Sequence, residues 1–186
     1  MAQYHKFPLV MKATTVITAF ATLLLALLTR FYSAGWLLPT AISIGTTCYH
    51  FAMRLAVGYV LPPLIPQNAA AKPWFRQKSF ESKLYMALKV KVWKDHMPTY
   101  DPRSFSLREN TLEQIIYNSC VSECVHEVIM LFSFIPLLFA LIWETFPAFL
   151  ITSTLAALFD CCFVIMQRYN RPRLIRILSK KEANGL

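Results

Sequence analysis

The sequence predicts an all-α membrane protein with about four transmembrane helices and a cytoplasmic amphipathic helical segment between the second and the third. Hydrophobic residues make up 56% of the 186 residues, which is more than an ordinary soluble domain contains. They gather into stretches that approach the roughly 20 residues needed by a membrane-spanning helix. The four stretches are 14–32, 36–61, 121–143 and 145–166.

The basic residues predict the orientation of these stretches. The formal net charge is +9, and nearly all lysines and arginines share one side of the membrane if both termini and the segment 66–120 lie there. Arg30 falls in a loop on the other side, and Arg54 lies inside the second stretch. By the positive-inside rule, we expect an integral protein of the cytoplasmic membrane with termini and central segment in the cytoplasm. This asymmetry favours membrane lipids as partners and argues against nucleic acid.

We expect one integral membrane domain made of three segments. Residues 1–66 would form an N-terminal transmembrane hairpin, 67–120 a cytoplasmic interfacial segment, and 121–186 a C-terminal transmembrane hairpin with a basic tail. The first hydrophobic stretch is followed by Arg30 rather than by a cleavage site of small residues, so we expect it to be retained.

The interfacial segment contains two regions with helical spacing of apolar residues. Residues 81–93 combine this spacing with several charges, which predicts an amphipathic helix lying on the membrane surface. Pro98 and Pro102 then interrupt the helical pattern and predict a loop. Residues 108–119 resume the helical pattern and lead into the third hydrophobic stretch.

A carboxylate and an imidazole stand at the start of the third stretch. Glu123 lies three residues before His126 and four before Glu127, so a helix places the three side chains on one face. A carboxylate in that position can hold the tautomer and orientation of the imidazole, as a general base requires. The alternative interpretation is a polar helix end at a membrane surface.

The third and fourth stretches are joined by few residues and are expected to form an antiparallel hairpin. At about 1.5 Å per residue, His126 comes level with the last turn of the fourth stretch, just inside Gln167. Asp160 lies about two turns deeper than Gln167, where an ionisable side chain is a candidate functional group. Its alternative role is that of a partly protonated aspartate hydrogen-bonded to a neighbouring helix.

The fourth stretch leads into a strongly basic run. Its three guanidinium groups offer forked donors for phosphate or carboxylate oxygens, and a proline among them predicts that they lie at a helix exit. The run reads Gln167-Arg168-Tyr169-Asn170-Arg171-Pro172-Arg173-Leu174.

The five cysteines indicate neither a metal site nor a disulfide framework. None forms a C-x-x-C pair with matching histidines, and all lie in or near the hydrophobic stretches. We therefore expect no metal. Cys120 and Cys124 lie close to His126 in the sequence, but neither is supported as a covalent nucleophile as well as His126 is supported as a base.

Three motifs resemble the glycosyl-4,4'-diaponeurosporenoate acyltransferase family. They are Lys89-Val90-Lys91-Val92-Trp93-Lys94-Asp95 followed by Pro98, then Glu123-x-x-His126, and finally the basic run that begins at Gln167. Together they extend over about the C-terminal two thirds of the chain, and the basic run is the most specific. The chain departs from the family pattern at Val121, Glu127 and Asp160, where the family has Arg, Trp and Asn.

The resemblance implies a membrane-embedded acyltransferase. Such an enzyme moves a fatty acyl group from an activated donor to a hydroxyl of a lipid-like acceptor, for which a glycosylated carotenoid of staphyloxanthin-type biosynthesis is a candidate. The implied donor is an acyl thioester, either acyl-coenzyme A or acyl carrier protein, and no bound cofactor is implied.

Under this hypothesis, His126 is the catalytic base and Glu123 is its orienting partner. Donor or headgroup binding is assigned to Lys91, Lys94, Arg168, Asn170, Arg171 and Arg173. Supporting roles are assigned to Gln167, Asp160, Trp93 and Tyr169.

Two other classes of function remain open at this point. A non-enzymatic membrane protein that binds lipid or interacts with a partner would explain the basic surface and the amphipathic helix. A membrane transferase or reductase that uses a nucleotide would employ the same arginines on a diphosphate. The latter lacks support from a glycine-rich phosphate loop, because the four glycines are scattered.

Overall fold

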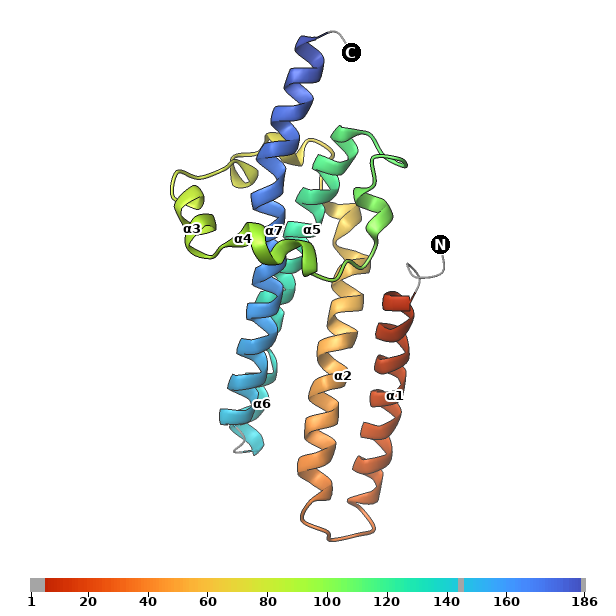
Figure 1. Cartoon of the computed structure of the whole chain (residues 1–186). Helices are drawn as coiled ribbons and strands as arrows, with labels where there is room; N and C mark the ends of the chain where they lie inside the picture. Colours follow the sequence, from red (N-terminus) through yellow and green to blue (C-terminus); the bar gives the residue numbers. More distant parts are fainter. Residues whose placement is uncertain (1–5, 144–145, 185–186) are drawn as a thin grey trace. The chain divides into compact units, whose positions relative to one another are not determined.

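The computed structural model describes residues 6–143 and 146–184, and within these ranges it contains helices and no strand (Figure 1). The all-α prediction is therefore confirmed. The α-helices are α1 (Lys6–Leu28), α2 (Leu37–Val60), α3 (Glu81–Ala87), α4 (Val90–Trp93), α5 (Leu112–Phe132), α6 (Pro136–Trp143) and α7 (Phe146–Ala183). Short 3₁₀ turns are Pro62–Leu64, Ala69–Ala71, Pro73–Phe75, Lys94–His96 and Pro102–Phe105.

The chain forms two compact units. Unit 1 consists of Met1–Tyr59 and Phe132–Ala156, and unit 2 consists of Val60–Leu131 and Ala157–Leu186. The units cut across the three segments expected from the sequence, because α5 and α7 each contribute residues to both.

In unit 1, α1 and α2 pack side by side (Figure 1). A Cβ added at Gly45 of α2 would lie 3.2 Å from Cγ2 of Thr22 on α1, so the missing side chain permits this close approach. The Sγ atom of Cys48 also donates to the carbonyl oxygen of Thr15 at 3.7 Å. Tyr49 donates through its hydroxyl to the carbonyl oxygen of Phe132 at 2.8 Å, which satisfies one acceptor at the end of α5.

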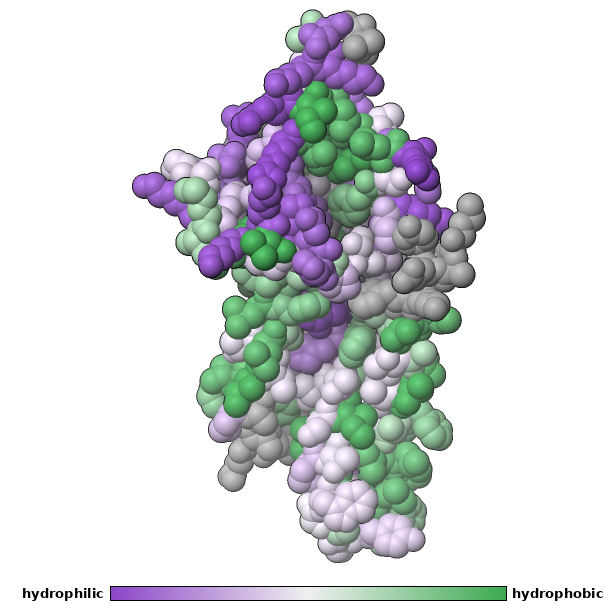
Figure 2. Space-filling model, in the orientation of Figure 1, coloured by the Kyte–Doolittle hydropathy of each residue, from purple (hydrophilic) through white to green (hydrophobic). Residues whose placement is uncertain are grey.

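Three helical stretches among the described residues are long and apolar enough to cross a membrane: Pro8–Leu28, Leu112–Ala140 and Phe149–Ala183. Only 6% of the first stretch is buried, and Figure 2 shows its surface largely in the green of apolar residues. Such a surface is stable against lipid rather than water. The protein is therefore a membrane protein.

Three membrane-spanning stretches are fewer than the four expected. The second expected span, 36–61, does form a helix of sufficient length, α2. This helix is less apolar than the three stretches above, because it contains Thr and Ser residues as well as His50 and Arg54.

The third expected span, 121–143, differs from the observed helices at both ends. Helix α5 already begins at Leu112, where the Thr111 hydroxyl accepts the backbone N–H of Gln114 at 3.3 Å. The helix then ends at Phe132, and α6 begins at Pro136. A proline has no N–H to continue the ladder and disfavours helical backbone in the residue before it, which explains the break.

The expected amphipathic helix over 81–93 is broken into α3 and α4. Lys89, between them, has a backbone φ of 49° in the left-handed region, which an α-helix cannot contain. The indole N–H of Trp93 donates back to the carbonyl oxygen of Leu88 at 3.0 Å and closes the turn. In the last helix the opposite occurs, because α7 continues through Pro172 to Ala183 instead of ending at the proline.

Candidate active site

The candidate site lies in unit 2, between α5 and α7. Contacts pair His126 with Asp160, Glu123 with Arg168, and Ser119 with Arg171. Residue numbers fall along α5 as they rise along α7, so the two helices are antiparallel here, as the hairpin prediction expected. The buried positions of α7 in this unit recur at helical spacing and form one face: Ala157, Asp160, Phe163, Gln167 and Arg171.

His126 is held on two sides by residues of α7. Its Nδ1 lies 2.8 Å from Oδ1 of Asp160, and its ring stacks on Phe163 with centroids 4.3 Å apart and an interplanar angle of 6°. The Asp160 side chain is 2% exposed, whereas that of His126 is 21% exposed. When Nδ1–H donates to Asp160, Nε2 is the nitrogen with a free lone pair.

The carboxylate that orients His126 is therefore Asp160 rather than Glu123. The sequence predicted that His126 lies level with the last turn of the fourth stretch, just inside Gln167. In the structure it contacts Phe163 and, about one turn deeper, Asp160. Glu123 instead accepts hydrogen bonds from two guanidinium groups. The physical reason is that these cations come from α7, where their rigid forks match a carboxylate better than a single imidazole N–H does.

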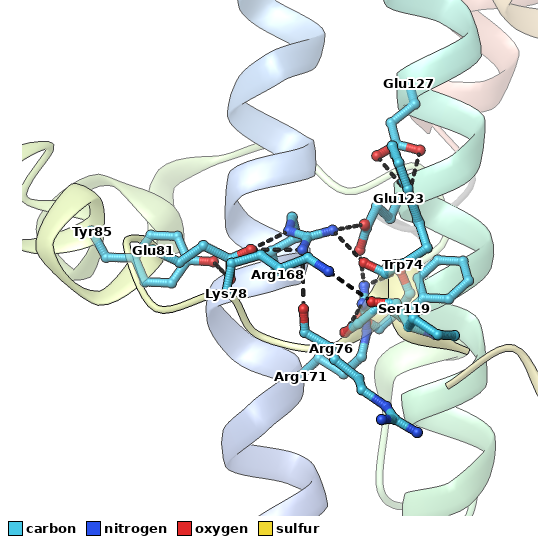
Figure 3. A network of polar contacts seen from close by, with 12 residues as sticks. Trp74, Arg76, Lys78, Glu81, Tyr85, Ser119, Glu123, Glu127, Arg168 and Arg171 are labelled. Carbon is cyan, nitrogen blue, oxygen red and sulfur yellow. Dashed lines mark hydrogen bonds and ion pairs between the residues drawn. The ribbon is translucent and has the colours of Figure 1, made fainter. Parts of the chain in front are cut away.

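Glu123 is the centre of a buried ion network (Figure 3). It is 0% exposed, and its Oε1 accepts from Nη1 of Arg168 at 2.5 Å. Its Oε2 accepts from Nη2 of Arg171, which is 1% exposed. Arg171 also donates to the Ser119 hydroxyl at 3.2 Å, to the Ser119 carbonyl at 3.3 Å and to the Phe75 carbonyl at 3.1 Å. Every nitrogen of this guanidinium is thus engaged.

A second carboxylate, Glu81 of α3, completes the network on the other side of Arg168 (Figure 3). Its Oε1 accepts from Nε and Nη2 of Arg168 at 2.9 and 2.6 Å, while its Oε2 accepts from the Tyr85 hydroxyl at 2.8 Å. Burial and this hydrogen bond raise the pKa of the Tyr85 hydroxyl well above its usual range, so it remains a donor at physiological pH. Arg168 also donates to the carbonyl oxygens of Trp74 and Arg76 at 3.1 and 3.3 Å.

Two carboxylates and two guanidiniums balance the charge of this network. Removing charges from water is costly unless they are paired and hydrogen-bonded, and here both conditions are met. The expectation that Arg168 and Arg171 bind the donor is therefore corrected. Their hydrogen-bonding groups are committed to Glu81, Glu123, Ser119 and backbone carbonyls, so their role is to hold α3, the 73–76 turn and α5 against α7.

Glu127 also faces the 73–76 turn. The indole N–H of Trp74 donates to both of its carboxylate oxygens at 3.2 Å. Glu127 thus serves as an acceptor for a tryptophan supplied by another part of the chain.

The lysine-rich motif makes its described polar contacts locally. Lys94 pairs with its neighbour Asp95 at 2.6 Å, and the hydrogen bond from Lys94 lowers the pKa of the Asp95 carboxyl. Trp93 bonds Leu88, and Lys91 is exposed on α4. Within the described residues, no hydrogen bond or ion pair joins these three side chains to His126 or to α7.

The other members of the basic run surround a hollow. Arg173 donates to the Tyr169 hydroxyl at 2.6 Å, and its guanidinium carbon lies 4.0 Å from the centre of the Tyr169 ring. Tyr169 packs edge-on against Tyr85 with ring centroids 5.3 Å apart. Gln167, Asn170 and Arg173 line the hollow together with apolar residues.

Sequence reasoning did not anticipate the roles of Glu81, Ser119, Trp74 and Phe163. A signal existed for one of them, because Glu81 is the single acidic residue among seven lysines and arginines in 67–94. A lone acid among many bases is a candidate for a specific ion pair, but the sequence does not say which cation it meets. Ser119 and Phe163 carry no such signal.

Fold and site together define a helical membrane protein in which an imidazole with an orienting carboxylate lies next to a buried ion network. A model of the glycosyl-4,4'-diaponeurosporenoate acyltransferase family matches residues 71–180, more than half of the chain. The chain belongs to this family, and the resemblance found in its motifs is confirmed. Searches among curated proteins and among solved structures gave no match. The matched range includes α3, α4, α5, α6 and most of α7, and therefore the whole candidate site.

Proposed function

We propose that the protein transfers a fatty acyl group from an activated donor to a hydroxyl of a lipid-like acceptor in the membrane. The observation that supports this proposal is the His126–Asp160 pair in a chain that belongs to an acyltransferase family. The name of the family makes a glycosylated carotenoid the first acceptor to test. Membrane helices on either side of the site suit apolar substrates of this kind.

His126 acts as the general base in this mechanism. Its Nε2 takes the proton of the acceptor hydroxyl while the hydroxyl oxygen attacks the carbonyl carbon of an acyl thioester. The carbon–sulfur bond then breaks, and the thiolate leaves with the proton from His126. Asp160 is a positioning residue, because its hydrogen bond to Nδ1 holds the tautomer in which Nε2 is free. Stacking on Phe163 limits rotation of the ring.

We further propose that both termini and the segment 66–120 face the cytoplasm, which requires that α2 crosses the membrane in addition to the three more apolar stretches. The supporting observation is the asymmetric distribution of lysine and arginine about the apolar stretches. A site between α5 and α7 that opens to the cytoplasm would have access to soluble acyl thioesters and to membrane acceptors.

The proposal predicts that His126→Ala abolishes acyl transfer while the protein remains in the membrane. Loss of a general base typically lowers the rate by about 10²–10⁴-fold. Membranes from cells expressing either form would be supplied with acyl-coenzyme A and the acceptor, and the acylated product would be quantified by mass spectrometry. His96→Ala is the matched control, because His96 lies exposed in the Lys94–His96 turn.

Near-normal transfer by the His126→Ala protein would refute the base assignment. Equal lipid and pigment profiles in cells with and without the wild-type protein would instead favour a non-enzymatic role in lipid binding or protein interaction. Protein amount in the membrane and thermal unfolding in detergent separate either result from a loss of folded protein.

A further inference from the structure

A hollow of about 320 Å³ opens beside α7 in unit 2, separate from the His126–Asp160 pair. Three apolar side chains line it, those of Phe105, Ile115 and Leu174. Three polar side chains complete the lining, those of Gln167, Asn170 and Arg173. A ligand for this site must therefore combine an apolar portion with groups that bond to amides and to a cation.

Gln167 indicates that the hollow is a binding site. It is 6% exposed, and its side-chain amide has no hydrogen-bond partner among the residues that the structure describes. The Gln167 amide atoms are not among the fully buried polar atoms that lack a partner, so they are accessible from the hollow and can bond to a ligand there. Asn170, one turn further along α7, is also without a described partner. Each carboxamide offers both a donor and an acceptor, so the matching ligand groups are amides or hydroxyls.

Arg173 provides the positive charge at the hollow. The Tyr169 hydroxyl accepts from one of its nitrogens, and the Tyr169 ring lies under the guanidinium. These contacts hold the group in place, and its other N–H donors have no described protein acceptor. Unlike Arg168 and Arg171, this arginine has no carboxylate partner in the described part of the chain. Its preferred ligand is an anion with several oxygens, such as a phosphate.

We propose that the hollow binds the phosphopantetheine arm of the acyl donor. This inference rests on the proposed function, which requires an acyl thioester. The arm carries two amides for Gln167 and Asn170, a phosphate for Arg173, and methyl and methylene groups for the apolar lining. The same arm occurs in acyl-coenzyme A and in acyl carrier protein, so both sources share this chemistry.

Spacing along α7 agrees with this assignment. Gln167 lies seven residues after Asp160, which is nearly two turns, so both side chains are on one face about 10 Å apart along the axis. Leu174, at the other end of the hollow, lies about 21 Å from Asp160 along the axis. The arm has about thirteen bonds between phosphorus and sulfur, as many as four extended residues, which span about 14 Å. The His126 ring stacks on Phe163, which lies ten residues before Arg173, or about 15 Å along the axis. An arm of about this length with its phosphate at Arg173 therefore brings the thioester close to the His126 ring.

The test measures binding of two small probes, 4′-phosphopantetheine and pantetheine, to the full-length protein in detergent by calorimetry. The wild-type protein should bind the phosphorylated probe about tenfold or more tightly, because a charge-assisted hydrogen bond distinguishes the two. Arg173→Gln should abolish this preference. Gln167→Leu should weaken both probes by a similar factor, about tenfold, and leave the preference intact.

Arg176→Gln is the matched control, since it removes an exposed arginine from the same helix outside the hollow. It should leave both affinities unchanged. Equal affinity of the wild-type protein for the two probes, a phosphate preference that survives Arg173→Gln, or an absence of binding would each overturn the proposal. Thermal unfolding of each variant identifies any that are misfolded, and Asn170→Ala, at a less buried position, provides a second variant of the amide pair.

His126→Gln separates this proposal from the proposed function. It should bind both probes as the wild-type protein does and lose acyl transfer. Persistent transfer by His126→Gln would refute the function without affecting the binding result, whereas transfer that depends on His126 without probe binding would refute only the phosphopantetheine site. Comparing KM for acyl-coenzyme A and acyl carrier protein then identifies the source of the arm.

Discussion

His126 and Asp160 form a paired imidazole and carboxylate in an apolar setting. Asp160 is 1% exposed, and a carboxylate at such a position is costly unless a donor meets it. The Nδ1–H group of His126 donates to the Asp160 carboxylate, and this hydrogen bond also fixes the orientation of the imidazole ring. Phe163 covers one face of the ring, and the part of the imidazole that remains exposed is the part that the proposed mechanism uses.

For single side chains, we predict that Asp160→Leu lowers the rate of acyl transfer much more than Asp160→Asn does. Leucine has a similar volume but no acceptor for Nδ1–H, so the ring loses its orientation and preferred tautomer, at an expected cost of about a hundredfold or more in rate. Asparagine keeps an oxygen acceptor for Nδ1–H. Initial rates of both variants would be compared at saturating substrate. Equal rates for the two variants would contradict a positioning role for Asp160.

At the scale of elements, the ion network acts as the joint between helices of unit 2. Glu81 belongs to α3, Glu123 and Ser119 to α5, and both arginines to α7. Further hydrogen bonds fasten the intervening chain to α5, because Tyr117 donates to the Ile65 carbonyl at 3.0 Å and Asn118 to the Ser104 carbonyl at 2.7 Å. The segment between α2 and α5 is thereby held on the helix pair by polar contacts.

This arrangement predicts that Glu123→Ala destabilises the protein by about 3–5 kcal/mol, because two buried guanidiniums lose their shared counter-ion. Glu113→Ala should change the free energy of unfolding by less than about 0.5 kcal/mol, since Glu113 is exposed on the first turn of the same helix. Unfolding in detergent, followed by circular dichroism, measures both. A double change of Glu123 and Arg171 to methionine should recover part of the loss. Equal stability of the Glu123→Ala and Glu113→Ala proteins would contradict the assigned role of the network.

For the whole molecule, the balance of the network clarifies the basic character of the chain. The two arginines and two glutamates cancel, so the net charge of +9 arises outside the network. We therefore expect the exposed lysines and arginines outside the network to interact with lipid headgroups and to set the orientation of the chain in the membrane. Figure 2 shows hydrophilic side chains gathered on unit 2, along the C-terminal part of α7 and over the segment that contains α3 and α4.

The proposed orientation predicts different labelling of two single cysteines in a variant without the five native ones. Arg30→Cys, between α1 and α2, should react with a membrane-impermeant maleimide in intact cells. Lys91→Cys, on α4, should react only after permeabilisation, because its side of the membrane carries most of the basic residues. Ser179→Cys serves as a control for the C-terminal part of α7. Equal reactivity of Arg30→Cys and Lys91→Cys in intact cells would indicate that α2 does not cross the membrane.

The sequence by itself determined the features that depend on local pattern. Apolar runs of sufficient length predicted membrane helices, the short link between the last two runs predicted the antiparallel pairing of α5 and α7, and the motifs identified the family. Each of these follows from neighbours along one chain segment, because helix formation and membrane partition are governed by the composition of that segment.

Only the tertiary structure decided the partners of the charged groups. Glu123 lies three residues from His126 in the sequence, yet it binds arginines 45 and 48 residues away, while His126 binds Asp160. Each carboxylate on α5 can bind any donor on the facing side of α7. Which donor it binds depends on the register of α7 along α5 and on the rotation of α7 about its own axis. The way α7 is turned toward α5 also places Arg168 and Arg171 in the buried network. It leaves Gln167, Asn170 and Arg173 at the hollow. The sequence alone does not show which of the three arginines in this run are buried in the network.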